Sequence, residues 1–133
     1  MGRLTRRKAI SGRVSEEVHR ELRGIARAEG RSVSEVLARL AEQGVRMRRF
    51  PGLVFIDGPG GPRAHLAGTG FDAWELVALF RAYGGDVARL LRDHPALERR
   101  ELELALEYAK AYPEEIDQFI ADNEAQARGL APV

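Results

Sequence analysis

The chain has 133 residues, of which 44% are hydrophobic and 31% charged, a balance typical of a folded protein with one ordinary domain or two small ones. It contains no cysteine, which excludes disulfides and thiolate metal sites, and its three histidines lie far apart in the sequence. We therefore expect neither a metal ion nor another cofactor. No apolar run reaches the roughly 18 residues of a membrane span, and no apolar stretch of the kind found in secretory signals follows the basic start. We expect a cytoplasmic protein without a membrane partner.

The net charge of +1 hides a strong asymmetry along the chain. Residues 1–50 contain 13 Lys and Arg against 6 Glu, a net charge of +7, whereas residues 51–133 contain 8 against 14, a net charge of −6. A basic half is suited to nucleic acid, because neutralised phosphates release counterions. The acidic half would be repelled from the same ligand, so it requires a different explanation.

Residues 8–14 alternate in a way that predicts a short strand, with Ile10 and Val14 on one face and Ala9, Ser11 and Arg13 on the other. A single strand leaves its backbone groups without partners, and no nearby segment resembles a second strand. We therefore expect this strand to pair antiparallel with the same strand of a second copy.

Two helices are expected after this strand. Ser15 is placed to cap the first helix, which should stop at Gly30. Ser32 and Glu35 have the spacing of a capping box, and the second helix should end between Val45 and Arg48. About 40 residues of this kind bury too little surface to fold alone, which again indicates a dimer.

In such a dimer the two strands form a ribbon whose outer face can enter the major groove of double-stranded DNA. Arg13 is the best candidate for a bidentate contact to guanine, and Ser11 can donate or accept a hydrogen bond. The free amides at the start of the second helix can bind a phosphate, although Ser32 could serve only as a cap. The predicted DNA-binding residues are Lys8, Ala9, Ser11, Arg13, Ser32, Val33 and Ser34.

The run from Ile10 to Val18, continued by Leu22, Ala26 and the segment 30–37, resembles the ribbon-helix-helix family of prokaryotic repressors and antitoxins. The resemblance covers about 40 residues and implies an intertwined DNA-binding dimer. One departure is Gly12, where the family usually has a large apolar residue. A glycine there would weaken the packing of the ribbon or introduce a bulge.

The segment 46–52 marks a domain boundary, and a β-hairpin is expected after it. Its glycine-rich turn is not a phosphate-binding loop, because no Gly-Lys-Ser/Thr follows and no helix begins directly after it. Asp72 and Glu75 then form a second capping box, and three helices with tight connections suggest a helix-turn-helix arrangement. The expected elements are strands at 53–56 and 63–67 and helices over 73–83, from 86 to a stop at His94-Pro95, and from 98 to about 109.

The segments 68–70, 84–86, 94–97 and 101–109 are similar to a small domain of unknown function, family four-three-three, found in VapB-type antitoxins. The resemblance implies a winged-helix-like fold. The family commonly has Gly-Thr-Arg where this chain has Gly-Thr-Gly at 68–70. Because the helix that would read DNA carries four glutamates, we expect this domain to bind a protein or to support the dimer.

A last helix is expected from Pro113, with Ile116, Phe119 and Ile120 along one side. This stripe could bind a partner protein, or it could pack against its own domain. The pattern ends near residue 123, so residues 125–133 are expected to form a flexible tail.

The sequence thus predicts a mainly α fold with small β content, a ribbon-helix-helix followed by a β-hairpin and a helix-turn-helix-like helical domain. The expected domains are residues 1–48, residues 49–124 and the tail. The expected function is a type II antitoxin that represses its own operator as a dimer and neutralises a cognate toxin, by resemblance a PIN-type ribonuclease. The alternative is a stand-alone ribbon-helix-helix regulator whose second domain senses a ligand or stabilises the dimer. An enzyme is not expected, because no nucleophile with a base, metal cluster or phosphate loop is recognisable.

Overall fold

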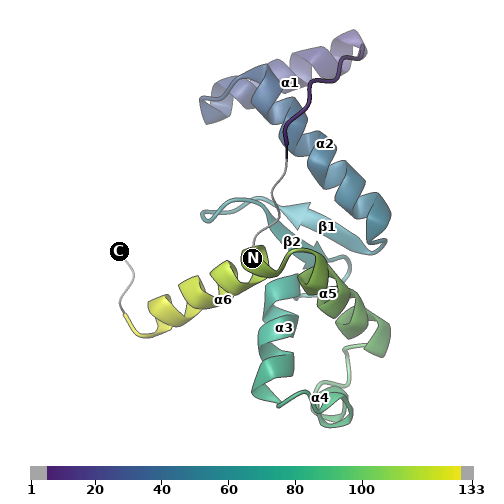
Figure 1. The fold of residues 1–133 in the computed structure, drawn as a ribbon, viewed down its shortest axis with the longest axis vertical. Coiled ribbons are helices and arrows are strands. Elements are labelled where there is room, and N and C mark those ends of the chain that lie inside the picture. Colours follow the sequence, from purple (N-terminus) through teal and green to yellow (C-terminus); the bar gives the residue numbers. More distant parts are fainter. Residues whose placement is uncertain (1–5, 130–133) are drawn as a thin grey trace. The chain divides into compact units, whose positions relative to one another are not determined.

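The computed structural model of this chain describes residues 6–129. Over that range the fold is mainly helical, with six α-helices and one two-stranded antiparallel sheet (Figure 1). The coarse prediction, mainly α with small β, is confirmed. The chain divides into two compact units between Arg48 and Arg49, and each unit is described by itself below.

The first unit contains two helices whose termini follow the capping signals in the sequence. In α1 (Glu16–Glu29) the Ser15 hydroxyl accepts a hydrogen bond from the backbone N–H of Val18 at 3.1 Å. The helix stops at Gly30, whose φ of 66° is readily adopted only by a residue without a Cβ. α2 (Val33–Arg49) then begins at the predicted capping box and runs one residue beyond the predicted range.

The core of the first unit is small. Only Leu22, Ala26 and Val36 are buried in its described part, with two half-buried apolar residues packed against them. An ion pair at the surface joins the end of α1 to α2: the Arg39 guanidinium donates to both carboxylate oxygens of Glu29, at 2.7 and 3.0 Å. Three buried side chains are far fewer than an independently stable domain requires.

The strand predicted at residues 8–14 is absent from the single chain, since residues 6–15 form neither helix nor strand. The physical reason is that a strand needs a partner for its backbone groups, and the prediction assigned that partner to a second copy. The intertwined ribbon therefore stays a prediction.

The second unit opens with the predicted hairpin. β1 (Leu53–Ile56) pairs antiparallel with β2 (Arg63–Leu66), with Leu53 opposite Leu66 and Ile56 opposite Arg63. The hairpin is confirmed, and its second strand is one residue shorter than expected.

Four helices complete the second unit. α3 packs against α5, α6 and β2, so it lies at the centre of the unit, where a helix that is apolar nearly all round belongs (Figure 1). Phe50 and Tyr108 meet edge to face in the core, with ring centroids 5.4 Å apart. The helices are α3 (Ala73–Ala82), α4 (Val87–Asp93), α5 (Arg99–Ala111) and α6 (Pro113–Ala127).

The predicted end of the second domain at residue 124 is wrong. α6 continues to Ala127, and residues 125–127 belong to the helix rather than to a tail. The apolar stripe ends near Ile120, but the following Glu, Gln and Ala residues have high helix propensity, so the helix continues without burying a face. Residues 130–133 lie outside the described range.

Among the described residues, no helix combines the length and the apolar character required to cross a membrane.

Candidate nucleic-acid interface and polar cluster

The predicted base-reading residues Lys8, Ala9, Ser11 and Arg13 are all exposed. They lie in the irregular segment before α1, and within residues 6–129 none of their side chains forms a hydrogen bond or an ion pair. The single chain therefore leaves these side chains available but does not gather them into one surface. The apolar residues that alternate with them are also exposed, Ile10 to 95%.

The start of α2 offers fewer free amides than predicted. The Ser32 hydroxyl accepts from the N–H of Glu35 at 3.0 Å, and the Glu35 carboxylate accepts from the N–H of Ser32 at 3.1 Å. This N–H of Ser32, together with the hydroxyl of the same residue, lowers the pKa of Glu35. Ser32 is thus occupied as a cap, and of the three predicted phosphate-binding residues only Val33 and Ser34 have N–H groups without an internal acceptor in the described chain.

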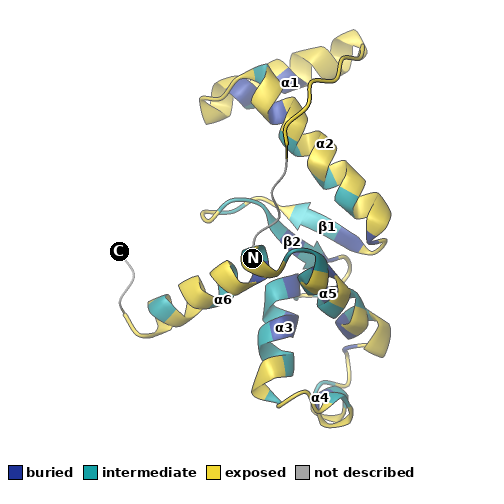
Figure 2. Ribbon diagram, in the orientation of Figure 1, coloured by how far each residue is buried: buried dark blue, intermediate teal, exposed yellow. Residues whose placement is uncertain are grey.

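Seven large apolar side chains are exposed on the described part of the first unit. Figure 2 shows that α1 and α2 are exposed over most of their length. Single exposed apolar residues are common, but seven large ones on a unit this small are unusual. The exposed large apolar residues of this unit are Ile10, Val14, Val18, Leu37, Leu40, Val45 and Met47.

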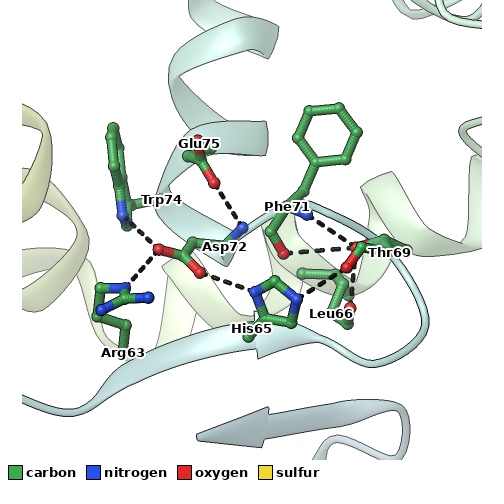
Figure 3. Close-up of polar contacts among 8 residues, drawn as sticks. All are labelled: Arg63, His65, Leu66, Thr69, Phe71, Asp72, Trp74 and Glu75. Carbon is green, nitrogen blue, oxygen red and sulfur yellow. Dashed lines mark hydrogen bonds and ion pairs between the residues drawn. The ribbon is translucent and has the colours of Figure 1, made fainter. Parts of the chain in front are cut away.

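In the second unit a buried carboxylate organises the connection between β2 and α3 (Figure 3). Asp72 is 6% exposed and receives three side-chain hydrogen bonds. Arg63 Nε donates to Oδ2 at 2.7 Å, Trp74 Nε1 donates to the same oxygen at 3.1 Å, and His65 Nδ1 lies 2.8 Å from Oδ1. Asp72 also occupies the N-cap of α3, and in the capping box Glu75 Oε1 accepts from the N–H of Asp72 at 2.8 Å.

The alternation of β2 explains how this cluster forms. Ala64 and Leu66 point into the core, so Arg63 and His65 share the opposite face and both reach Asp72. Burial acts to raise the pKa of Asp72, but the hydrogen bonds from His65 and Arg63 outweigh it and hold the pKa below its ordinary value. The carboxylate is therefore ionised and has partners on both oxygens.

The cluster does not have the geometry of a nucleophilic triad. His65 Nε2 faces the backbone carbonyl of Thr69 at 2.8 Å, where a triad would place a nucleophilic hydroxyl or thiol. The Thr69 hydroxyl donates instead to the carbonyl of Leu66 at 2.8 Å and accepts from the N–H of Phe71 at 3.0 Å. These bonds join β2, the loop and the start of α3, so the arrangement is suited to holding the loop rather than to acyl transfer.

A surface hollow of about 490 Å³ lies beside this cluster. It is formed by the hairpin turn, β2, the start of α3 and the outer part of α6. Its wall combines aromatic and polar groups, a composition that can accommodate a small ligand or a side chain of a partner. The lining residues are Pro59, Gly60, Arg63, His65, Gly70, Asp72, Trp74, Glu75, Phe119, Asp122, Asn123 and Gln126.

The three predicted partner-binding residues of α6 have different environments. Ile116 is 1% exposed and belongs to the core of its own unit, so its assignment to a partner surface is wrong for this conformation. Phe119 and Ile120 are half-buried, and Phe119 lines the hollow. For Ile116 the alternative interpretation, packing against its own domain, is therefore the correct one.

Sequence reasoning missed two groups of residues. The alternation of Arg63 and His65 on β2, with Asp72 seven residues after His65, could have revealed the polar cluster. The second group is a row of arginines at helical spacing on α1, Arg20, Arg23 and Arg27, which are all exposed. Their spacing of three and four residues is visible in the sequence and is the signal that could have revealed this row.

Comparisons with known proteins assign neither unit, because the chain matches no family model, no curated protein and no solved structure.

Proposed function

We propose that this chain is an antitoxin-type repressor that binds operator DNA as a dimer through its first unit and a toxin through its second. In this proposal residues 8–14 of two copies pair as an antiparallel ribbon, which gives the first unit a ribbon-helix-helix arrangement. Its outer face, with Ala9, Ser11 and Arg13, reads the major groove. Val33 and Ser34 at the start of α2 contribute amides for a phosphate.

The observation that carries the proposal is the incomplete core of the first unit. Three buried residues support two helices, while seven large apolar side chains remain exposed in the same unit. A second copy covers such a surface by symmetry, and the isolated segment at residues 8–14 acquires its strand partner from the same event. Ile10 and Val14 then lie inside the dimer, and Ser11 and Arg13 face outward.

Charge supports DNA as the ligand of that dimer. Residues 1–50 carry a net charge of +7, which doubles in the dimer, and long-range attraction to phosphates scales with this charge. Arg13 is exposed and has a guanidinium suited to the O6 and N7 atoms of guanine.

The acidic second unit is assigned to a protein partner. Its net charge of −6 over residues 51–133 disfavours a second DNA contact, and α5 exposes Glu103 and Glu107. By resemblance to VapB-type antitoxins, the partner is a toxin, a PIN-type ribonuclease whose metal-dependent site the antitoxin blocks. Phe119 and Ile120 are the residues of α6 that remain partly accessible to it.

One observation favours a second candidate function. The hollow of about 490 Å³ beside Asp72 has the size of a small-ligand site, which fits a stand-alone regulator whose second unit senses a ligand. The two candidates differ in their partner: the antitoxin requires a toxin that arrests growth, and the regulator requires a small molecule that changes operator affinity.

The DNA contact is tested by selecting bound fragments from the genome of the native host with the full chain, and then comparing Arg13→Ala with Arg92→Ala. Arg92 is exposed in the acidic unit, so its substitution removes the same charge away from the ribbon. Because the dimer carries two copies of Arg13 and each bidentate contact contributes about 1 to 3 kcal/mol of discrimination, Arg13→Ala should lower the preference for the selected site at least tenfold. An unchanged preference would remove the ribbon from the mechanism.

The toxin contact is tested by co-expression. The protein encoded by the neighbouring reading frame should arrest growth when expressed alone and should be neutralised by this chain. A neighbouring product that does not affect growth and does not bind would refute the antitoxin and leave the regulator.

A further inference from the structure

One face of α1 carries a row of arginines that the proposed ribbon does not use. Arg20, Arg23 and Arg27 are spaced three and four residues apart, so they lie on one side of the helix. His19 and Gly24 lie among them, and these five residues line a surface hollow of about 390 Å³.

This face is turned away from the core of its own unit. The buried residues of α1 are Leu22 and Ala26, which pack with Val36 of α2. At 100° per residue, the mean direction of the three arginines lies about 110° around the helix from that of Leu22 and Ala26. Covering the apolar face with a second copy therefore leaves this basic face accessible.

The arginines of this face have no partners in the described chain. Over residues 6–129, Arg20, Arg23 and Arg27 form no ion pair or hydrogen bond through their side chains, whereas Arg31 and Arg39 of the same unit pair with Glu29. Arg23 and Arg27 are four residues apart, a spacing at which like charges destabilise a helix by a few tenths of a kcal/mol. The repulsion between Arg23 and Arg27 acts against the stability of α1, and the row as a whole concentrates positive charge on one surface.

Gly24 is a second observation that favours a ligand on this face. Glycine inside a helix costs roughly 1 kcal/mol relative to alanine, and nothing in the fold explains it, since a Cβ at this position would meet no atom within 4 Å. The missing side chain leaves the helix backbone accessible between the arginines. Glycine at such a position allows another backbone to approach closely.

We infer that the Arg20–Arg23–Arg27 face of α1 is a second DNA contact, which binds phosphates of the duplex independently of base sequence. This inference rests on the proposed DNA-binding function and extends its footprint beyond the ribbon. Guanidinium groups donate two parallel hydrogen bonds to phosphate oxygens, and the gap at Gly24 lets the sugar-phosphate chain lie against the helix. A membrane surface fits less well, because the buried apolar residues of α1, Leu22 and Ala26, are packed against Val36 of α2 and cannot enter the lipid.

The test measures how the affinity of the full chain for a 30-base-pair duplex of random sequence depends on NaCl concentration, by fluorescence anisotropy. The variant Arg20→Gln/Arg23→Gln/Arg27→Gln is compared with Arg92→Gln/Arg99→Gln/Arg128→Gln. The second variant removes the same total charge from exposed arginines of the acidic unit. Glutamine retains good helix propensity, and circular dichroism verifies that α1 is intact.

The α1 variant should lose at least tenfold in affinity at low salt. The slope of log affinity against log salt should flatten by at least 1 and by up to about 5, because each neutralised phosphate contributes about 0.9 and a dimer offers six arginines. The control variant should retain a slope close to that of the wild type. Equal slopes in the two variants would overturn the inference.

The outcome for Arg13→Ala separates this inference from the proposed function. If Arg13→Ala loses the preference for the selected operator while the α1 variant keeps the wild-type salt slope, the ribbon stands and the second contact is refuted. If Arg13→Ala keeps the operator preference while the α1 variant loses affinity, the contact through α1 stands and the ribbon is refuted. A wild-type chain that binds no duplex at all overturns both.

Discussion

Leu37 on α2 provides the most quantitative test of the dimer. Its side chain is 46% exposed in the single chain, and the proposed dimer buries it. Complete burial of a leucine is worth about 1.5 to 3 kcal/mol, so burial of the remaining half contributes about 0.7 to 1.4 kcal/mol in each copy. The substitution Leu37→Ala removes most of this burial free energy from both copies. The dimer dissociation constant should rise by roughly tenfold to a hundredfold.

The assay is sedimentation equilibrium of the full chain over a range of concentrations. Ile56→Ala is the matched control, because Ile56 is a large apolar residue of similar exposure, 37%, in the second unit. Alanine has the highest helix propensity, so Leu37→Ala does not weaken α2 itself. A wild-type chain that is monomeric at every concentration, or equal effects of the two substitutions, would refute the reasoning.

Three further substitutions test the fold. Asp72→Asn should lower the free energy of unfolding of the second unit by about 2 to 4 kcal/mol, because Arg63 and His65 lose their buried partner; calorimetry against the exposed Asp57→Asn checks this, and equal effects would contradict it. The pKa of Asp72 is lower in the folded than in the unfolded chain, so its contribution to the free energy of unfolding is complete above the unfolded pKa near 3.8 and is lost as the pH falls through the folded pKa. The excess stability of the wild type over Asp72→Asn should therefore shrink in acid. Gly24→Ala should stabilise α1 by about 1 kcal/mol, measured by chemical denaturation, and a loss of stability would mean that the space at Gly24 is filled. Ser15→Ala should cost about 1 kcal/mol by removing the cap on Val18, and no change in denaturation would show that the cap contributes nothing.

Local signals predicted most of the secondary structure. Ser15, Ser32 and Asp72 mark helix starts, Gly30 marks a helix end, and the two short apolar runs around the glycine-rich turn form the hairpin. These features depend on contacts only a few residues apart, which is why the sequence alone reveals them. The end of α6 was missed because helix propensity extends it beyond the last apolar residue.

The polar cluster was harder to predict because its geometry is tertiary. In the sequence Asp72 has the pattern of an ordinary helix cap. Its burial is evident only in the fold, where β2 places Arg63 and His65 against it. In the same way, the amphipathic spacing of α6 predicted an apolar face, but only the packing of the unit shows that Ile116 is inside and that Phe119 lies at the hollow. The residues of the predicted ribbon depend on a second chain, so no property of one chain can bring them together.

Pairing of residues 8–14 between two copies is the central claim, and an isotope-filtered nuclear Overhauser experiment on a mixed-labelled sample tests it most directly. One population carries ¹⁵N and ¹³C and the other carries neither, so only contacts between copies are detected. The proposed ribbon predicts cross-copy signals between backbone protons within residues 8–14, together with strand-like chemical shifts there. Irregular shifts and no cross-copy signals from this segment, at concentrations where the chain is dimeric, would contradict the account.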